Sequence, residues 1–155
     1  MPVFPLEPGV AIGILGGGQL GRMLALAAAR LGFDVVILEP EPDSPAGRVA
    51  AHTIVAPYDD PMGLGALAAA ACVVTYEFEN VPAAAVSQLT EMGLEVAPGA
   101  RALAVAQDRL EEKTFLNAHG VSTVAFAAAS NAEEAAQAVL QVGAPALMKT
   151  RREGY

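Results

Sequence analysis

The stretch VAIGILGGGQLG, residues 10–21, decides the fold class of this 155-residue chain. Its first half is a compact apolar run typical of a buried strand, and apolar residues recur at helical spacing over residues 19–31. Between these two segments, Gly16, Gly18 and Gly21 have the spacing G-x-G-x-x-G. A strand, a glycine turn and a helix in this order are typical of the nucleotide-binding half of a doubly wound α/β fold.

The rest of the chain continues to alternate short apolar runs with helical stretches, which predicts a parallel sheet with crossover helices. The further strands expected are 34–38, 52–56, 72–76 and 94–97, with helices over 62–71 and 82–92. Beyond residue 100 the pattern predicts two consecutive helices, then a strand over 124–129, a helix over 132–142 and a strand over 145–149. We therefore expect a domain boundary near residues 98–107.

Composition and charge exclude several classes of protein. Hydrophobic residues make up 54% of the chain, which excludes disorder, and no apolar run reaches the ~20 residues that cross a bilayer. The net charge of −8 disfavours nucleic-acid binding. The first nine residues hold three prolines and no basic residue, so we expect no secretory signal and a cytoplasmic location. Cys72, His52 and His119 predict neither a disulfide nor a metal site.

Two carboxylates are predicted to lie beside the glycine loop, residues 16–21. Glu39 ends the second strand, where a dinucleotide-binding fold has its ribose-binding carboxylate. Glu77 follows the strand 72–76, which should adjoin the first strand, and we expect it to contact a ligand. The N–H groups at the N-terminus of the following helix are expected to be free for a phosphate. We expect Asn80 to cap the following helix, and a glycine turn that binds nothing is the alternative interpretation of the loop.

Five strings carry a resemblance to a known family. In order they are IGILGGGQLGRML, ILEPEPDSPAGRVA, VTYEFENVP, AQDRLEEKTFL and LMKTRREGY. Together they closely resemble the N-terminal part of N5-carboxyaminoimidazole ribonucleotide synthetase, an ATP-grasp ligase of purine biosynthesis. The co-occurrence of GGGQLGRM, YEFENVP and QDRL is much more specific than the glycine motif alone. The resemblance covers essentially the whole chain, from about Val10 to Tyr155.

The resemblance implies a Rossmann-like pre-ATP-grasp domain over residues 1–98, followed by linker helices and the incomplete first part of an ATP-grasp domain over 99–155. The family uses ATP and Mg²⁺ to carboxylate 5-aminoimidazole ribonucleotide with bicarbonate, releasing ADP and phosphate, and it implies a homodimer. The family's metal ligands and the rest of its substrate site have no counterpart in this sequence. We therefore assign no catalytic or metal residue and expect the chain alone to be inactive.

The resemblance also implies roles for individual residues. The positions that match ATP-binding residues of the family are Arg109, Lys149, Gly154 and Tyr155. The positions that match its ribonucleotide side are Gly16, Gly17, Gly18, Gln19, Leu20 and Glu77. Without the resemblance, Arg109 would be an exposed helical residue paired with Glu112. Arg151 and Arg152 are equally consistent with a phosphate contact and with a solvated basic end.

Other interpretations stay open from the sequence. A formate-dependent glycinamide ribonucleotide transformylase shares the same plan, although Gln19, YEFENVP and QDRL favour the synthetase. An NAD-binding module is supported only by the glycine loop and Glu39, and a noncatalytic homologue is a third possibility. Whichever holds, we expect rapid amide exchange beyond about Gly120, because the strands expected there lack neighbours.

Overall fold

The computed structural model describes residues 5–153 of the chain. The chain divides into two compact units, residues 1–103 and 104–155, which we call the sheet unit and the helical unit. The division falls inside helix α4 (Ala100–Ala106). Gly154 and Tyr155, two residues expected to bind ATP, lie outside the described residues.

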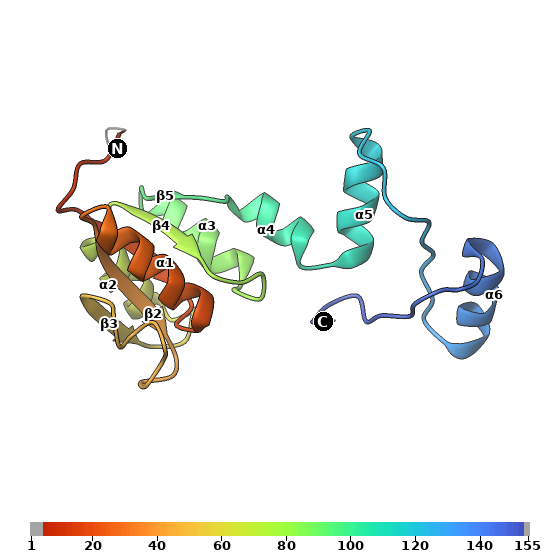
Figure 1. Ribbon diagram of the computed structural model, residues 1–155, viewed down its shortest axis with the longest axis horizontal. Coiled ribbons are helices and arrows are strands. Elements are labelled where there is room, and N and C mark those ends of the chain that lie inside the picture. Colours follow the sequence, from red (N-terminus) through yellow and green to blue (C-terminus); the bar gives the residue numbers. More distant parts are fainter. Residues whose placement is uncertain (1–4, 154–155) are drawn as a thin grey trace. The chain divides into compact units, whose positions relative to one another are not determined.

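The sheet unit is built on five parallel strands in the order β3-β2-β1-β4-β5 (Figure 1). The strands are β1 (Ala11–Leu15), β2 (Asp34–Glu39), β3 (His52–Val55), β4 (Val73–Tyr76) and β5 (Glu95–Val96). The helices between them are α1 (Gln19–Arg30), α2 (Pro61–Ala70) and α3 (Ala83–Glu91). The predicted doubly wound α/β fold is confirmed, with strand order reversing at β1.

The register of the central strands brings three chain segments together. Leu15, the last residue of β1, pairs with Leu38 of β2 on one side and with Tyr76 of β4 on the other. The residues that follow these three therefore lie at one level, at the same edge of the sheet. They are Gly16, Glu39 and Glu77, so the glycine loop starts between the two carboxylates.

The core lies on both faces of the sheet because neighbouring strand residues point to opposite sides. Ile14 and Ile37 are buried with the small residues Ala25 and Ala28 of α1 on one face. The other face is larger and packs strand residues against α2 and α3. Its fully buried side chains include Leu15, Leu38, Leu64, Leu67, Val74, Val86, Leu89 and Leu103.

The expected cap of α3 is not made. Pro82 is the residue before the helix, and no side chain forms a capping hydrogen bond there. A capping side chain belongs to the residue immediately before the first helical residue. Asn80 is separated from Ala83 by Val81 and Pro82, so the prediction that Asn80 caps α3 is wrong for a positional reason.

The helical unit contains α5 (Arg109–Ala118) and α6 (Ala132–Val142), and neither helix has a buried residue. The predicted helix over 132–142 is confirmed. The predicted strands over 124–129 and 145–149 are wrong, because both described segments have irregular backbone. A strand needs a neighbouring strand for its N–H and C=O groups, and these two segments do not pair with one another.

Candidate functional site

The glycine loop is held to the strand ends by its own backbone. Gly16 has φ of 110°, a left-handed conformation that favours glycine, and its N–H donates to the Leu38 carbonyl at 3.0 Å. The Gly17 carbonyl accepts a hydrogen bond from the Ala46 N–H at 2.8 Å. The loop is therefore tied both to β2 and to the proline-rich segment that follows β2.

Glu39 is turned into the protein and binds the loop. The residue is 8% exposed, and Oε2 accepts hydrogen bonds from the Gly17 N–H at 2.6 Å and from the Tyr58 hydroxyl at 2.7 Å. Oε1 accepts from the Glu41 N–H at 3.1 Å. Burial raises the pKa of Tyr58, and the hydrogen bond to Glu39 and the charges of Glu39 and Glu77 raise it further, so the hydroxyl is a permanent donor at neutral pH.

Glu77 binds the same loop from the opposite side. Its Oε1 accepts from the Gly18 N–H at 2.7 Å and its Oε2 from the Gly21 N–H at 2.5 Å. Gly18 is the N-cap residue of α1 and Gly21 lies in the first turn, so the carboxylate satisfies N–H groups at the positive end of the helix dipole. Glu77 thus reaches the loop as the strand order predicts, but the bonds it makes are to protein backbone.

The loop glycines are required because these carboxylates come so close. A Cβ atom on Gly17 would lie 2.6 Å from Cγ of Glu39 and 2.5 Å from Oγ of Ser44, and one on Gly18 would lie 2.6 Å from Oε1 of Glu77. The close approach that a dinucleotide fold gives to a pyrophosphate is therefore made here to two protein carboxylates. The expectation of free N–H groups at the start of the helix is wrong for Gly21. The N–H groups of Gly17 and Gly18 in the loop before it are also bound by protein carboxylates, which disfavours the NAD-binding interpretation.

Two N–H groups at the end of the loop are available to a ligand. Within residues 5–153, the N–H groups of Gln19 and Leu20 have no hydrogen-bond partner, and both residues are exposed. They belong to the first turn of α1, where N–H groups have no partner within the helix. The donors left to a ligand are thus in two of the residues that the resemblance assigns to the ribonucleotide.

Tyr58 and Ser44 are parts of the site that the sequence did not predict. The Tyr58 ring packs edge-on against Phe78, the neighbour of Glu77, with ring centroids 5.8 Å apart. The register of β2 and β3 pairs Glu39 with Val55, which brings the residues after Val55 toward the Glu39 carboxylate. That register is visible only in the sheet. In the sequence, the one signal for this contact is a tyrosine shortly after the third predicted strand.

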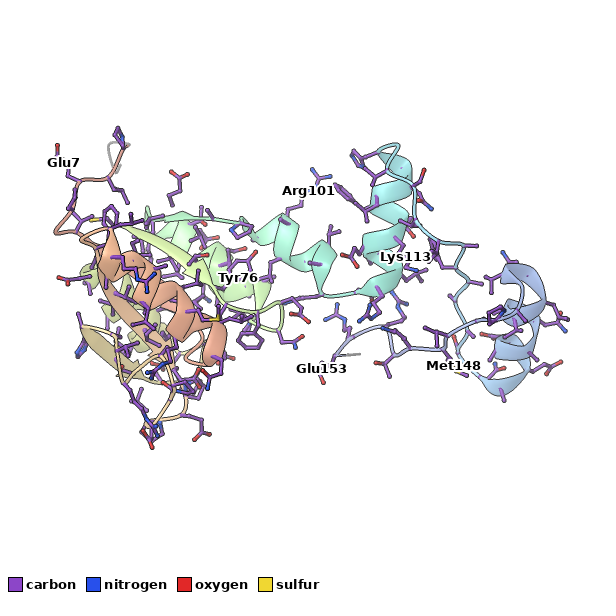
Figure 2. The ribbon with its side chains drawn as sticks, viewed as in Figure 1. Glu7, Tyr76, Arg101, Lys113, Met148 and Glu153 are labelled. Carbon is purple, nitrogen blue, oxygen red and sulfur yellow. The ribbon has the colours of Figure 1, made fainter. Side chains whose placement is uncertain are left out.

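The helical unit contains the expected ATP-binding residues Arg109 and Lys149. Arg109 is partly buried and opens α5, whereas Lys149 is exposed in irregular backbone. Arg151 is paired with Asp108, the N-cap residue of α5, at 2.7 Å. Figure 2 shows the segment that ends at Glu153 returning toward the start of α5. Of the two interpretations left open for Arg151, the structure favours a protein partner.

Two further features are absent from residues 5–153. No group of three or more His, Cys, Asp or Glu side chains among them could hold a metal ion. Likewise, no helix in this described range is long and apolar enough to cross a membrane.

Comparison with known proteins agrees with the fold and the motifs. Residues 10–107 match the family described as the ribonucleotide synthetase preATP-grasp domain. The chain is 51% identical over 150 residues to the N5-carboxyaminoimidazole ribonucleotide synthase of Brucella melitensis biotype 1, covering 97% of this chain and 41% of that protein. The chain thus spans about 40% of the length of the curated relatives it matches.

Solved structures give the same result. N5-carboxyaminoimidazole synthetase from Staphylococcus aureus complexed with ADP superposes with a TM-score of 0.88 at 40% identity, covering 97% of this chain and 40% of that one. The Aspergillus clavatus enzyme in complex with ADP and 5-aminoimidazole ribonucleotide superposes with a TM-score of 0.80 at 30% identity. The match covers 94% of this chain and 39% of that one. With the family match extending over residues 10–107, the chain belongs to the ribonucleotide synthetase preATP-grasp family.

Proposed function

We propose that the chain is the N-terminal portion of an ATP-dependent ligase that carboxylates 5-aminoimidazole ribonucleotide with bicarbonate. The product is N5-carboxyaminoimidazole ribonucleotide, and ADP and phosphate are released. The observation that carries this proposal is the match over 97% of the chain to N5-carboxyaminoimidazole ribonucleotide synthases. One structural relative was solved with ADP and the aminoimidazole ribonucleotide together.

In this proposal the glycine loop and Glu77 form one wall of the ribonucleotide site. The N–H groups of Gln19 and Leu20 at the start of α1 suit a phosphate, because the helix dipole adds to their hydrogen bonds. Gly16, Gly17 and Gly18 let Glu39 and Glu77 approach the backbone and set the loop conformation. The Glu77 carboxylate retains acceptor capacity for a ribose hydroxyl beside its two backbone bonds.

The ATP side of the proposal rests on Arg109 and Lys149, together with Gly154 and Tyr155 outside the described residues. An arginine offers a planar fork to phosphate oxygens and a lysine offers a mobile point charge. Mg²⁺ in the whole enzyme would neutralise charge on the transferred phosphoryl group. Residues 5–153 contain no cluster of metal ligands, so we assign the metal no ligand among them.

The finer assignments follow the resemblance. We propose a pre-ATP-grasp domain over residues 1–98, and linker helices with the first part of an ATP-grasp domain over 99–155. We also propose a homodimeric, cytoplasmic whole enzyme. The homodimer has some support in α1, where the apolar side chains Leu20, Met23 and Leu24 are 57%, 65% and 41% exposed.

Calorimetric titration of the 155-residue chain tests the proposal. We expect 5-aminoimidazole ribonucleotide to bind and NADH not to bind. Because phosphoryl transfer needs metal and cations around the phosphates, we also expect no ADP release above background when ATP, bicarbonate and the ribonucleotide are supplied. Binding of NADH at micromolar or tighter affinity would overturn the proposal, and ribonucleotide-stimulated ADP release would overturn the expected inactivity.

Two variants test whether the ribonucleotide binds at the glycine loop. In Glu77→Gln the side chain keeps one acceptor oxygen but loses the charge and the second acceptor, so ribonucleotide affinity should fall about tenfold or more. Glu41→Gln is the matched control, since its side chain is exposed and only its backbone N–H contacts Glu39. Equal losses of affinity in the two variants would argue against a ribonucleotide site at the loop.

A further inference from the structure

One side-chain pair in the helical unit joins residues that are 43 positions apart in the sequence. The Asp108 carboxylate faces the Arg151 guanidinium with both oxygens. Oδ1 accepts from Nε at 3.1 Å, and Oδ2 lies 2.7 Å from Nη2. This is the two-point geometry that makes arginine–carboxylate pairs strong and directional.

The backbone makes a second link between the same two segments. The Arg109 N–H donates to the Arg151 carbonyl at 2.9 Å. Asp108 also caps α5, because its Oδ1 accepts from the N–H groups of Leu110 at 2.9 Å and Glu111 at 3.3 Å. A single carboxylate therefore fixes both the first turn of α5 and the segment that carries Arg151.

Burial sets Asp108 apart from the charges around it. Asp108 is 6% exposed, although no apolar residue of α5 is buried. The charged groups that face the pair are exposed and more distant. Nε of Arg152 lies 3.8 Å from Oδ2 of Asp108, and Oε1 of Glu111 lies 3.8 Å from Nη2 of Arg151. A carboxylate removed from water is stable only while its partner stays in place.

The two linked segments carry the residues proposed to bind ATP. Arg109 directly follows Asp108, and Lys149 lies two residues before Arg151. We infer that Asp108 is a positioning residue that holds these two segments together, so that Arg109 and Lys149 meet a nucleotide as one preorganised pair. This inference rests on the proposed function, in which both residues contact ATP. Preorganisation raises affinity because the ordering cost is met before the ligand binds.

Nuclear magnetic resonance on the 155-residue chain tests the inference with two readouts. The first is hydrogen exchange of the Arg109 amide, and the second is ATP affinity from amide shifts in a titration with ATP. The informative variant is Asp108→Asn, whose amide oxygen still caps the helix but whose charge is gone. Arg152→Gln is the matched control, because Arg152 reaches Asp108 only at 3.8 Å and is exposed.

In Asp108→Asn we expect the Arg109 amide to exchange about tenfold faster and ATP affinity to fall about tenfold, the factor for losing a charge-assisted hydrogen bond. The exchange rates of the Leu110 and Glu111 amides should change less. This difference separates loss of the link between the two segments from loss of the helix cap. Arg152→Gln should change both readouts by about twofold or less. Arg151→Lys keeps the charge without the fork, so its values should fall between those of Asp108→Asn and the wild type.

The outcomes separate the inference from the proposed function. If the wild-type chain binds ATP and Asp108→Asn binds it equally well, the positioning role is wrong while the ATP-binding residues stand. An unchanged Arg109 amide in Asp108→Asn also overturns the role. If ATP shifts no resonance of the wild-type chain, the ATP assignment of Arg109 and Lys149 fails, and the positioning role fails with it.

Discussion

The sheet unit and the helical unit use the same device in different surroundings. In each, a carboxylate binds the N–H groups at the start of a helix: Glu77 does so for α1, and Asp108 for α5. Each carboxylate also ties that helix to a segment far away in the sequence. In the sheet unit this contact lies beside a core of fully buried leucines and valines, whereas α5 and α6 bury no residue at all.

The comparison teaches that polar contacts position a segment without making it stable. Burial of apolar side chains is the dominant favourable term in folding, and the sheet unit has that term on both faces of the sheet. The helical unit relies on caps, ion pairs and partly exposed contacts such as Lys113 over the Phe126 ring at 5.4 Å. Such contacts contribute about 1 kcal/mol or less each.

Hydrogen exchange should show the largest difference between the two units. Amides of β1, β2 and β4 should exchange only on global unfolding, while amides beyond Gly120 should exchange almost freely. Opening free energies in one protein span from near zero to the full stability, so the protection should differ by about 1,000-fold or more. Peptide-resolved exchange at neutral pH measures it, with α1 and α6 as a matched pair of amphipathic helices of similar length. Equal protection of α1 and α6 would break the comparison.

The sequence predicted the sheet unit better than the helical unit for a physical reason. Strand and helix patterns are local, and in the sheet unit every predicted strand finds a neighbour, so local preference and pairing agree. The segments 124–129 and 145–149 have the same apolar pattern but no strand to pair with. An apolar pattern indicates which face of a strand would be buried, but it does not indicate which strand would pair with it.

The candidate site was predictable in its position and not in its bonding. Strand order places Glu39 and Glu77 beside the glycine loop, and that much followed from the motif. Which atoms accept hydrogen bonds from the loop N–H groups depends on side-chain rotamers and on Tyr58. The register of β3 against β2 brings Tyr58 to the Glu39 carboxylate. Likewise, nothing in the pattern around QDRL relates Asp108 to Arg151, because their contact is not local.

Substitutions at two glycines sharpen the comparison inside the sheet unit. Gly17→Ala puts a Cβ 2.6 Å from Cγ of Glu39 and 2.5 Å from Oγ of Ser44, so it should destabilise this unit by about 1–3 kcal/mol. Gly65→Ala is the control, since its Cβ would meet nothing within 4 Å in α2. An alanine there should stabilise by about 0.5–1 kcal/mol. Urea unfolding followed by circular dichroism measures both, and a neutral Gly17→Ala would mean that the loop is not tightly enclosed.

The smallest expected effect is the pH response of the Asp108 link. The hydrogen bond from Arg151 holds the pKa of Asp108 below its ordinary value of 3.8, and the N–H groups of Glu111 and Leu110 act in the same direction while burial opposes them. Because the folded-state pKa is lowered, the contribution to stability is fully present above pH 3.8 and is lost as the pH falls below that value toward the folded-state pKa. The Asp108 carboxyl carbon shift should therefore titrate below 3.8, with faster exchange of the Arg109 amide over the same range.

A second ion pair provides the control for that titration. Arg48 and Asp43 in the sheet unit have the same 2.7 Å contact, but their side chains are 63% and 77% exposed, against 8% for Asp108. Arg48 likewise lowers the pKa of Asp43. Because this pair faces solvent, most of that pKa shift should disappear in 1 M salt, where charges are screened within about 3 Å. The Asp108 midpoint should move less with salt and should rise in Arg151→Gln. A midpoint of Asp108 that follows salt as closely as that of Asp43 would show that burial gives the link no added strength.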